Sequence, residues 1–148
     1  MIKLVTTFFY TGYLPFIPGT FGSIAGIALY YLIKDYPYLY IGVFLAVIAL
    51  GFIFCGKAEQ AFAKKDPQYV VIDEVAGMLL SLAFLPDDWR LVAMGFFIFR
   101  LLDTIKPFPA NGLQNRHGAL GIMADDLVAG IYTNLVLQAV CRIISINF

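Results

Sequence analysis

An uncharged run of 21 residues, from Tyr36 to Gly56, sets the strongest limit on how this chain can fold. As an α-helix rising about 1.5 Å per residue, the run is long enough to cross a hydrocarbon core of about 30 Å. Every backbone polar group in lipid needs an internal hydrogen bond, and a helix supplies one. The sequence therefore predicts a transmembrane helix over this run.

The composition extends this prediction to the whole chain of 148 residues, which we expect to form one domain over residues 1–148. Apolar residues make up 61% of the chain and charged residues 14%, compared with about 45–50% and 25% in soluble domains. The mean hydropathy is +0.82. Ten basic residues balance ten acidic ones, and no cationic stripe is present, so no binding to nucleic acid is expected.

Prolines and glycines divide the other apolar residues into shorter segments. Further membrane helices are expected from Phe21 or Gly22 to Ile33, from Val75 to Leu85, from Leu91 to Phe99, and from Asp125 to about Ile144. A short helix over Leu4 to Leu14 is expected to lie at the membrane interface, although the sequence also allows it to cross. The predicted fold is therefore an all-α polytopic membrane bundle with about five membrane helices.

The most charged segment, KAEQAFAKKDP from Lys57 to Pro67, indicates the orientation of the bundle. Basic loops favour the cytoplasmic side of a membrane. If this segment is cytoplasmic, alternation of the helices brings most other polar clusters to the same face. We therefore expect the candidate functional residues to gather at the cytoplasmic surface.

Carboxylates at the ends of apolar helices are the first candidates for function, because they are costly to place there without a cation. The candidate metal ligands and catalytic acids are Asp73, Glu74, Asp103, Asp125 and Asp126. Structural alternatives exist for each of them: acids suit the positive end of a helix dipole, they cap helices, and Asp103 is spaced to pair with Arg100.

Cationic and polar residues near these acids are candidates for binding a phosphate. They are Thr20, Ser23, Arg100, Lys106, Asn115 and Arg116, with His117, the only histidine, as a candidate acid or base. Several oxygen ligands beside cationic groups favour Mg²⁺ and the hydrolysis or transfer of a phosphate group. A membrane ion or metal transporter is the alternative, because it would also place acids inside a helical bundle. A membrane protein that only binds a partner is the second alternative.

Four motifs resemble the phosphatidylglycerophosphatase A family of bacterial membrane lipid phosphatases. They are PGTFGS (Pro18 to Ser23), DExxG (Asp73 to Gly77), FRLLDTIKPFP (Phe99 to Pro109) and NRHGALGIMADDLVAG (Asn115 to Gly130). Their order and spacing span most of the chain. One mild departure is Ala119, which stands where a second glycine is expected in some relatives.

This resemblance implies a Mg²⁺-dependent phosphatase of phospholipid biosynthesis in the bacterial inner membrane. It would remove the terminal phosphate of phosphatidylglycerophosphate to give phosphatidylglycerol, with its active site facing the cytoplasm. The resemblance leaves open which acids bind metal, which group activates water, and whether a phospho-aspartate forms. Direct attack by water is preferred, because neither a Cys-x5-Arg nor a DxDxT motif is present. The oligomeric state is also left open.

Overall fold

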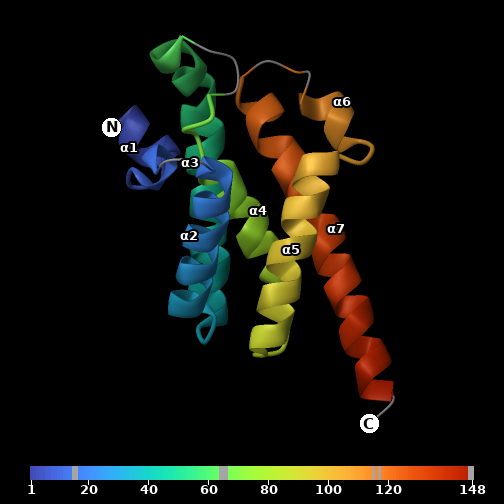
Figure 1. Ribbon diagram of the computed structural model, residues 1–148. Helices are drawn as coiled ribbons and strands as arrows, with labels where there is room; N and C mark the ends of the chain where they lie inside the picture. Colours follow the sequence, from blue (N-terminus) through green and yellow to red (C-terminus); the bar gives the residue numbers. More distant parts are fainter. Residues whose placement is uncertain (15–16, 64–66, 115, 117, 147–148) are drawn as a thin grey trace.

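The computed structural model describes residues 1–14, 17–63, 67–114, 116 and 118–146, and its regular elements are all helices. In chain order they are α1 (Ile2–Thr6), the 3-10 helix η1 (Thr11–Tyr13), α2 (Pro18–Ile33), α3 (Pro37–Phe62), α4 (Ile72–Leu82), α5 (Trp89–Ile105), α6 (Ala110–Gln114) and α7 (Ala119–Ile146) (Figure 1). The prediction of an all-α chain is confirmed in the described residues.

Two helices in the described part of the chain, α3 and α7, are long and apolar enough to cross a membrane. Helix α3 starts at Pro37, where a missing N–H costs no helical hydrogen bond. It continues past Gly56 to Phe62, because Lys57 is followed by good helix formers, and it ends at Ala63 in the left-handed conformation.

The other three long helices are shorter than a full membrane crossing. Helix α2 has 16 residues, α4 has 11 and α5 has 17, against about 20 needed to span the hydrocarbon core. The predicted number of about five membrane helices is therefore not confirmed. Helices α4 and α5 do extend through the charged residues Asp73, Glu74, Arg100 and Asp103, but α4 ends at Leu82 and α5 begins only at Trp89, so the residues between them form a turn instead of lengthening either helix.

The segment from Leu4 to Leu14 is not the single helix that we expected. Helix α1 ends at Thr6, and Phe8, Phe9 and Tyr10 all have positive φ angles, so the chain turns before η1. The backbone N–H of Val71 donates to the carbonyl oxygen of Thr6 at 2.9 Å, and α1 packs on α3. This segment therefore folds against the bundle.

Helix α4 lies inside the bundle, in contact with α2, α3, α5 and α7. Its closest neighbour is α7: a Cβ added to Gly77 would lie 2.8 Å from the backbone oxygen of Asp126, and one added to Gly130 would lie 2.7 Å from the oxygen of Gly77. Small residues let helix backbones approach closely in a membrane bundle. This contact holds the start of α4 beside the acids of α7.

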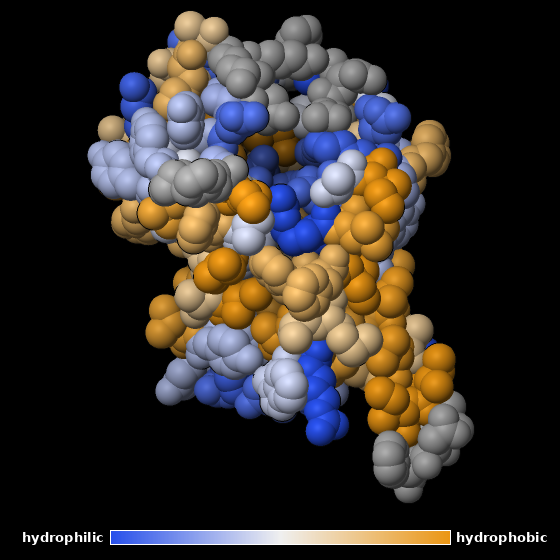
Figure 2. All heavy atoms as spheres, in the orientation of Figure 1, coloured by the Kyte–Doolittle hydropathy of each residue, from blue (hydrophilic) through white to orange (hydrophobic). Residues whose placement is uncertain are grey.

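The surface separates into polar and apolar zones, which Figure 2 shows on one face. A hollow lined by hydrophilic residues opens in the upper half, and a band of apolar side chains lies below it. Exposed apolar residues of this chain include Leu45, Ile53, Phe97 and Leu135, from three different helices. Large exposed apolar surfaces in proteins mark contact with lipid or a partner.

The opposite end of the bundle carries a second polar cluster. Lys34 Nζ lies 2.6 Å from Asp87 Oδ2 and 3.2 Å from Asp35 Oδ1. The hydrogen bonds to Asp87 and Asp35 raise the pKa of Lys34. The bundle thus has charged groups at two ends and apolar helix faces between them.

Candidate active site

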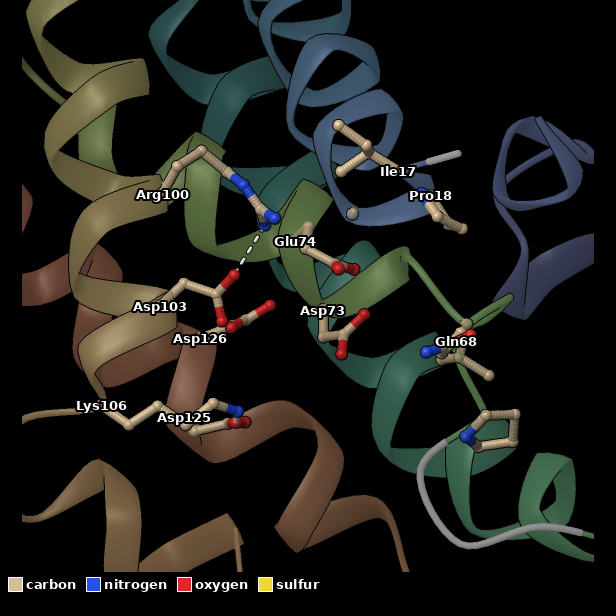
Figure 3. A pocket seen from close by; sticks show the side chains of 13 residues that line it. Ile17, Pro18, Gln68, Asp73, Glu74, Arg100, Asp103, Lys106, Asp125 and Asp126 are labelled. Atoms are coloured by element: carbon tan, nitrogen blue, oxygen red, sulfur yellow. Dashed lines mark hydrogen bonds and ion pairs between the residues drawn. The ribbon is translucent and has the colours of Figure 1, made fainter. Parts of the chain in front are cut away.

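A cavity of about 330 Å³ lies where the start of α2, the start of α4, the end of α5 and the first turns of α7 meet (Figure 3). Its size falls within the range of small-molecule sites, about 300–1,000 Å³. The lining residues are Ile17, Pro18, Gly19, Pro67, Gln68, Val70, Asp73, Glu74, Arg100, Asp103, Lys106, Asp125 and Asp126. All five predicted acids therefore lie in one cavity, together with Arg100 and Lys106.

Helix α4 brings Asp73 and Glu74 to the cavity in its first turn, where the helix dipole favours negative charge. Asp73 is only 7% exposed. Asp73 Oδ1 and Glu74 Oε2 are buried without a hydrogen-bond partner among the described residues. Burial raises the pKa of both carboxyl groups, and for Asp73 the neighbouring charge of Glu74 adds to the effect. Both groups therefore lack the stabilisation that a buried carboxylate needs.

Helix α5 presents Arg100 and Asp103 on one face, as their spacing predicts. Arg100 Nη1 donates to Asp103 Oδ2 at 2.6 Å, so the expected ion pair forms. Both side chains nevertheless line the cavity. Their pairing therefore does not remove them from the site.

Lys106 connects the end of α5 to α7. It follows the last helical residue of α5 in a left-handed conformation, and its Nζ lies 2.5 Å from Asp125 Oδ2. Burial by itself would lower the pKa of Lys106, but the hydrogen bond and the charge of Asp125 raise it above its usual value. Lys106 therefore stays charged beside the cavity.

Asp125 and Asp126 do not begin a helix, contrary to the sequence prediction. Helix α7 starts six residues earlier, at Ala119, after Gly118, which has φ +77° and donates its N–H to Glu59 Oε2 at 3.2 Å. The two acids are therefore inside α7 and cap nothing. They are 5% and 3% exposed.

The carboxylates form two overlapping groups. Asp73, Glu74 and Asp126 form one group, and Asp103, Asp125 and Asp126 form the other; within each, the possible ligand oxygens lie within 4.8 Å of one another. Three helices thus bring together residues that are up to 53 positions apart in the sequence. Carboxylate oxygens are the ligands that hard cations such as Mg²⁺ prefer, and the unpartnered oxygens of Asp73 and Glu74 fit such an ion.

Other residues predicted to bind substrate are not brought to the cavity. Thr20, Ser23 and Arg116 are described and do not line it. Ser23 is fully buried and its hydroxyl donates to the Gly19 carbonyl oxygen at 3.0 Å, while Arg116 is exposed. Asn115 and His117 lie outside the described residues. The roles of Thr20, Ser23 and Arg116 gain no support from the cavity.

Six lining residues were not among the predicted site residues: Ile17, Pro18, Gly19, Pro67, Gln68 and Val70. A Cβ at Gly19 would lie 2.5 Å from Glu74 Oε1 and 3.0 Å from Arg100 Nη1, so glycine lets α2 approach both groups without displacing them. The PGTFGS motif contains this glycine, but spacing alone does not reveal what it touches. Gln68 comes from the loop before α4, and no pattern in the sequence marks it.

The arrangement offers two kinds of groups to a ligand. Carboxylates from α4, α5 and α7 can hold a divalent cation, and Arg100 and Lys106 can contact phosphate oxygens. The start of α2 also faces the cavity, and the N-terminus of a helix attracts anions. The site is therefore suited to a phosphate group held beside a metal ion.

Comparison with known proteins supports this interpretation. A phosphatidylglycerophosphatase A of Escherichia coli (strain K12) is 40% identical over 137 residues, covering 90% of this chain and 80% of that protein. One of Haemophilus influenzae is 32% identical over 145 residues, covering 94% of this chain and 88% of that protein. A putative phosphatidylinositol-3-phosphatase of Bacteroides thetaiotaomicron is 37% identical over 152 residues, covering 94% of this chain and 92% of that protein. No solved structure matches the chain significantly.

The family model described as Phosphatidylglycerophosphatase A matches residues 4–141, which include every residue of the cavity. The match extends over nearly the whole chain, and two of the three relatives named above carry the same name. The chain is therefore a phosphatase that belongs to the phosphatidylglycerophosphatase A family.

Proposed function

We propose that this protein hydrolyses the terminal phosphate of phosphatidylglycerophosphate with the aid of Mg²⁺, giving phosphatidylglycerol and inorganic phosphate in phospholipid biosynthesis. The observation that carries the proposal is the meeting of five carboxylates and two cationic side chains in one cavity at the end of a helical bundle. The names of two relatives and of the family supply the substrate.

In this proposal the cationic residues hold the phosphate. Arg100 and Lys106 each keep a bond to a carboxylate, which fixes their positions, and each has further N–H donors for phosphate oxygens. The first turn of α2, at Pro18 and Gly19, adds the positive end of a helix dipole. These groups orient the phosphate toward the carboxylates.

Asp73, Glu74 and Asp126, with Asp103 and Asp125 beside them, would hold Mg²⁺. The bound ion would neutralise phosphate oxygens and lower the pKa of water. Water attacks phosphorus in line with the glycerol oxygen: the new bond forms to the water oxygen and the bond to the glycerol oxygen breaks. One proton of the water would pass through a cavity carboxylate or His117 to the leaving oxygen, and the other would stay on the new oxygen of the phosphate, giving an alcohol and hydrogen phosphate.

The proposed location is the cytoplasmic leaflet of a bacterial inner membrane. Helices α3 and α7 would cross, and the charged end of α3 at Lys57 would face the cytoplasm. Helix α7 starts level with Glu59 on α3, because Gly118 donates to that side chain. The cavity then opens on the side where Lys57 lies, and a lipid headgroup can reach it from the same leaflet.

A second substrate class follows from the relative named as a putative phosphatidylinositol-3-phosphatase. Its substrate also carries a phosphate monoester on a lipid headgroup. The cavity groups described above recognise a monoester, and nothing in their placement requires glycerol rather than inositol. Direct competition between the two lipids decides between them.

Phosphate release from purified protein tests the proposal. The protein is given phosphatidylglycerophosphate or phosphatidylinositol 3-phosphate in mixed micelles, with Mg²⁺ or with a chelator. We expect release from phosphatidylglycerophosphate only with Mg²⁺, and a higher kcat/KM than for the inositol lipid. Equal release with the chelator present would contradict the role of the metal. A higher kcat/KM for phosphatidylinositol 3-phosphate would contradict the proposed substrate.

The same assay addresses the transporter alternative, which no relative described above supports. A transporter would release no phosphate from either lipid. An ion flux across vesicles, in the absence of phosphate release, would revive that alternative.

A further inference from the structure

We infer that the cavity holds two divalent cations side by side, with the Asp126 carboxylate bound to both. This inference rests on the proposed function and goes further, because it assigns each carboxylate to one of two sites. Site A denotes Asp73, Glu74 and Asp126, and site B denotes Asp103, Asp125 and Asp126.

The geometry of the carboxylates supports two sites rather than one. In each group the ligand oxygens lie within 4.8 Å of one another, and Asp126 belongs to both groups. Ligands of one octahedral Mg²⁺ lie about 3–4.2 Å apart when each is about 2.1 Å from the ion. Each group therefore needs little adjustment to hold one ion. A carboxylate has two oxygens, so Asp126 can bind one ion with each.

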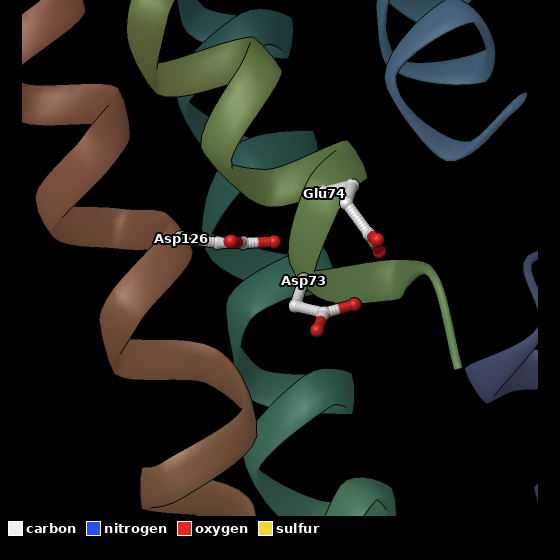
Figure 4. A group of neighbouring side chains, drawn as sticks. All are labelled: Asp73, Glu74 and Asp126. Atoms are coloured by element: carbon white, nitrogen blue, oxygen red, sulfur yellow. The ribbon is translucent and has the colours of Figure 1, made fainter. Parts of the chain in front are cut away.

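A second, independent observation points to a cation at site A. Asp73 is 7% exposed, and its Oδ1 is buried with no hydrogen-bond partner in the described part of the chain; the same is true of Glu74 Oε2. Figure 4 shows the carboxylates of Asp73, Glu74 and Asp126 beside one another at the start of α4. A buried carboxylate without a hydrogen bond or a cation is strongly unfavourable, and a divalent cation at site A would supply the partner that these oxygens lack among the described residues.

Site B already contains positive side chains, and these leave room for an ion. Arg100 binds Asp103 through Oδ2, and Lys106 binds Asp125 through Oδ2. Ligand oxygens of Asp103 and Asp126 also lie within 4.8 Å of each other. Two carboxylates in contact repel each other unless a proton or a cation lies between them. Arg100 and Lys106 thus balance two acids of the cavity and leave Asp126 without a partner of opposite charge among the salt bridges described.

The charge of the cavity with all its acids ionised also favours more than one ion. Five carboxylates and two cationic side chains line it, so in that state three negative charges remain uncompensated. One divalent ion leaves the cavity negative before a phosphate dianion enters, whereas two ions make it positive. Paired cations about 3.5–4 Å apart stabilise both the attacking and the leaving oxygen of an in-line displacement.

Manganese binding tests the inference without using activity. The full chain in detergent is dialysed against Mn²⁺, the bound metal is counted, and the electron paramagnetic resonance spectrum is recorded. We expect two Mn²⁺ per chain and a spectrum of an exchange-coupled pair. One Mn²⁺ per chain at saturation, with an uncoupled six-line spectrum, would overturn the inference.

Variants assign the ions to the sites. Asp103→Asn, in site B, is expected to reduce the number of bound Mn²⁺ ions per chain from two to one. Glu74→Gln, in site A, is expected to weaken the binding of the other ion. Asp126→Asn is expected to remove the coupling. Asp88→Asn is the matched control, because Asp88 caps α5 outside the cavity and asparagine caps equally well; it should bind two coupled ions. Coupling that persists in Asp126→Asn would show that Asp126 is not shared.

The failure of this inference and that of the proposed function give different results. One bound ion in a protein that still releases phosphate from phosphatidylglycerophosphate would remove the second site and keep the function. Two coupled ions in a protein that releases no phosphate would keep the metal pair and remove the function. Circular dichroism and gel filtration of each variant show whether it is folded.

Discussion

A Cβ added to Gly19 would lie 2.5 Å from Glu74 Oε1, the shortest such distance to a charged side-chain atom of the cavity. A methyl group here would overlap Glu74 Oε1, at the flexible end of a side chain, so the protein should fold normally while Glu74 is displaced. Because misplacement of a group by about 1 Å can cost about 100-fold in rate, we expect Gly19→Ala to lower kcat/KM by about 10- to 100-fold. Phosphate release and thermal unfolding of the variant measure the two effects.

Gly112→Ala is the control for this substitution, since a Cβ at Gly112 has no neighbour within 4 Å. Its activity should stay within about twofold of the parent, as for most surface substitutions. Equal activity of Gly19→Ala and Gly112→Ala would show that the approach of α2 to Glu74 has no role in the reaction.

Asp126 is the carboxylate shared by both groups of the cavity. Loss of an outer partner of a metal ligand typically costs about 10- to 100-fold, so loss of a shared ligand should cost more. We expect Asp126→Asn to reduce phosphate release by at least about 100-fold, with little change in unfolding temperature. Asp88→Asn should retain parental activity. Full activity in Asp126→Asn would exclude the residue from the mechanism.

At the scale of helices, the contact of α4 with α7 decides whether the acids meet. Gly77 lies against the ring of Phe99 and the backbone oxygen of Asp126, and neither neighbour can move easily. Overpacking of this kind typically costs about 1–3 kcal/mol. We therefore expect Gly77→Ala to reduce both the unfolding free energy, by about that amount, and the activity. Denaturation in detergent and phosphate release measure the two effects.

Gly42→Ala is the matched control inside α3, where the added methyl group meets nothing within 4 Å. Alanine is favoured over glycine in a helix by about 0.5–1 kcal/mol, so this variant should be as stable as the parent or more stable. If Gly77→Ala is as stable as Gly42→Ala, the close contact between α4 and α7 is not needed for stability.

The helices also show how far the sequence alone leads. The α3 helix and the placement of Asp73 and Glu74 in a first turn were predictable, because an uncharged run and acids before an apolar segment are local signals. The start of α7 was not predictable, because it depends on a hydrogen bond from Gly118 to Glu59, 59 residues away. The same limit applies to Gly19 and Gln68, whose roles depend on contacts between distant segments.

On the scale of the whole molecule, the site and the Lys34 cluster lie at different ends of the bundle. If the bundle crosses a bilayer, the exposed residues Arg116 and Asp87 should face opposite compartments. In inverted bacterial membrane vesicles, an impermeant maleimide should label Arg116→Cys directly and Asp87→Cys only after detergent is added. The parent chain, with Cys55 buried and Cys141 partly buried, gives the background. Labelling of both variants from the same side would contradict the crossing.

Cleavage by bound iron tests most directly whether carboxylates of α4, α5 and α7 share one metal centre. Fe²⁺ replaces Mg²⁺ in the purified protein, ascorbate and peroxide are added, and the cut positions are read by mass spectrometry. We predict cuts near residues 73, 103 and 126 in the same sample, suppressed by excess Mg²⁺ and absent near residues 87 and 88. Cuts confined to one helix, or not suppressed by Mg²⁺, would contradict the shared centre.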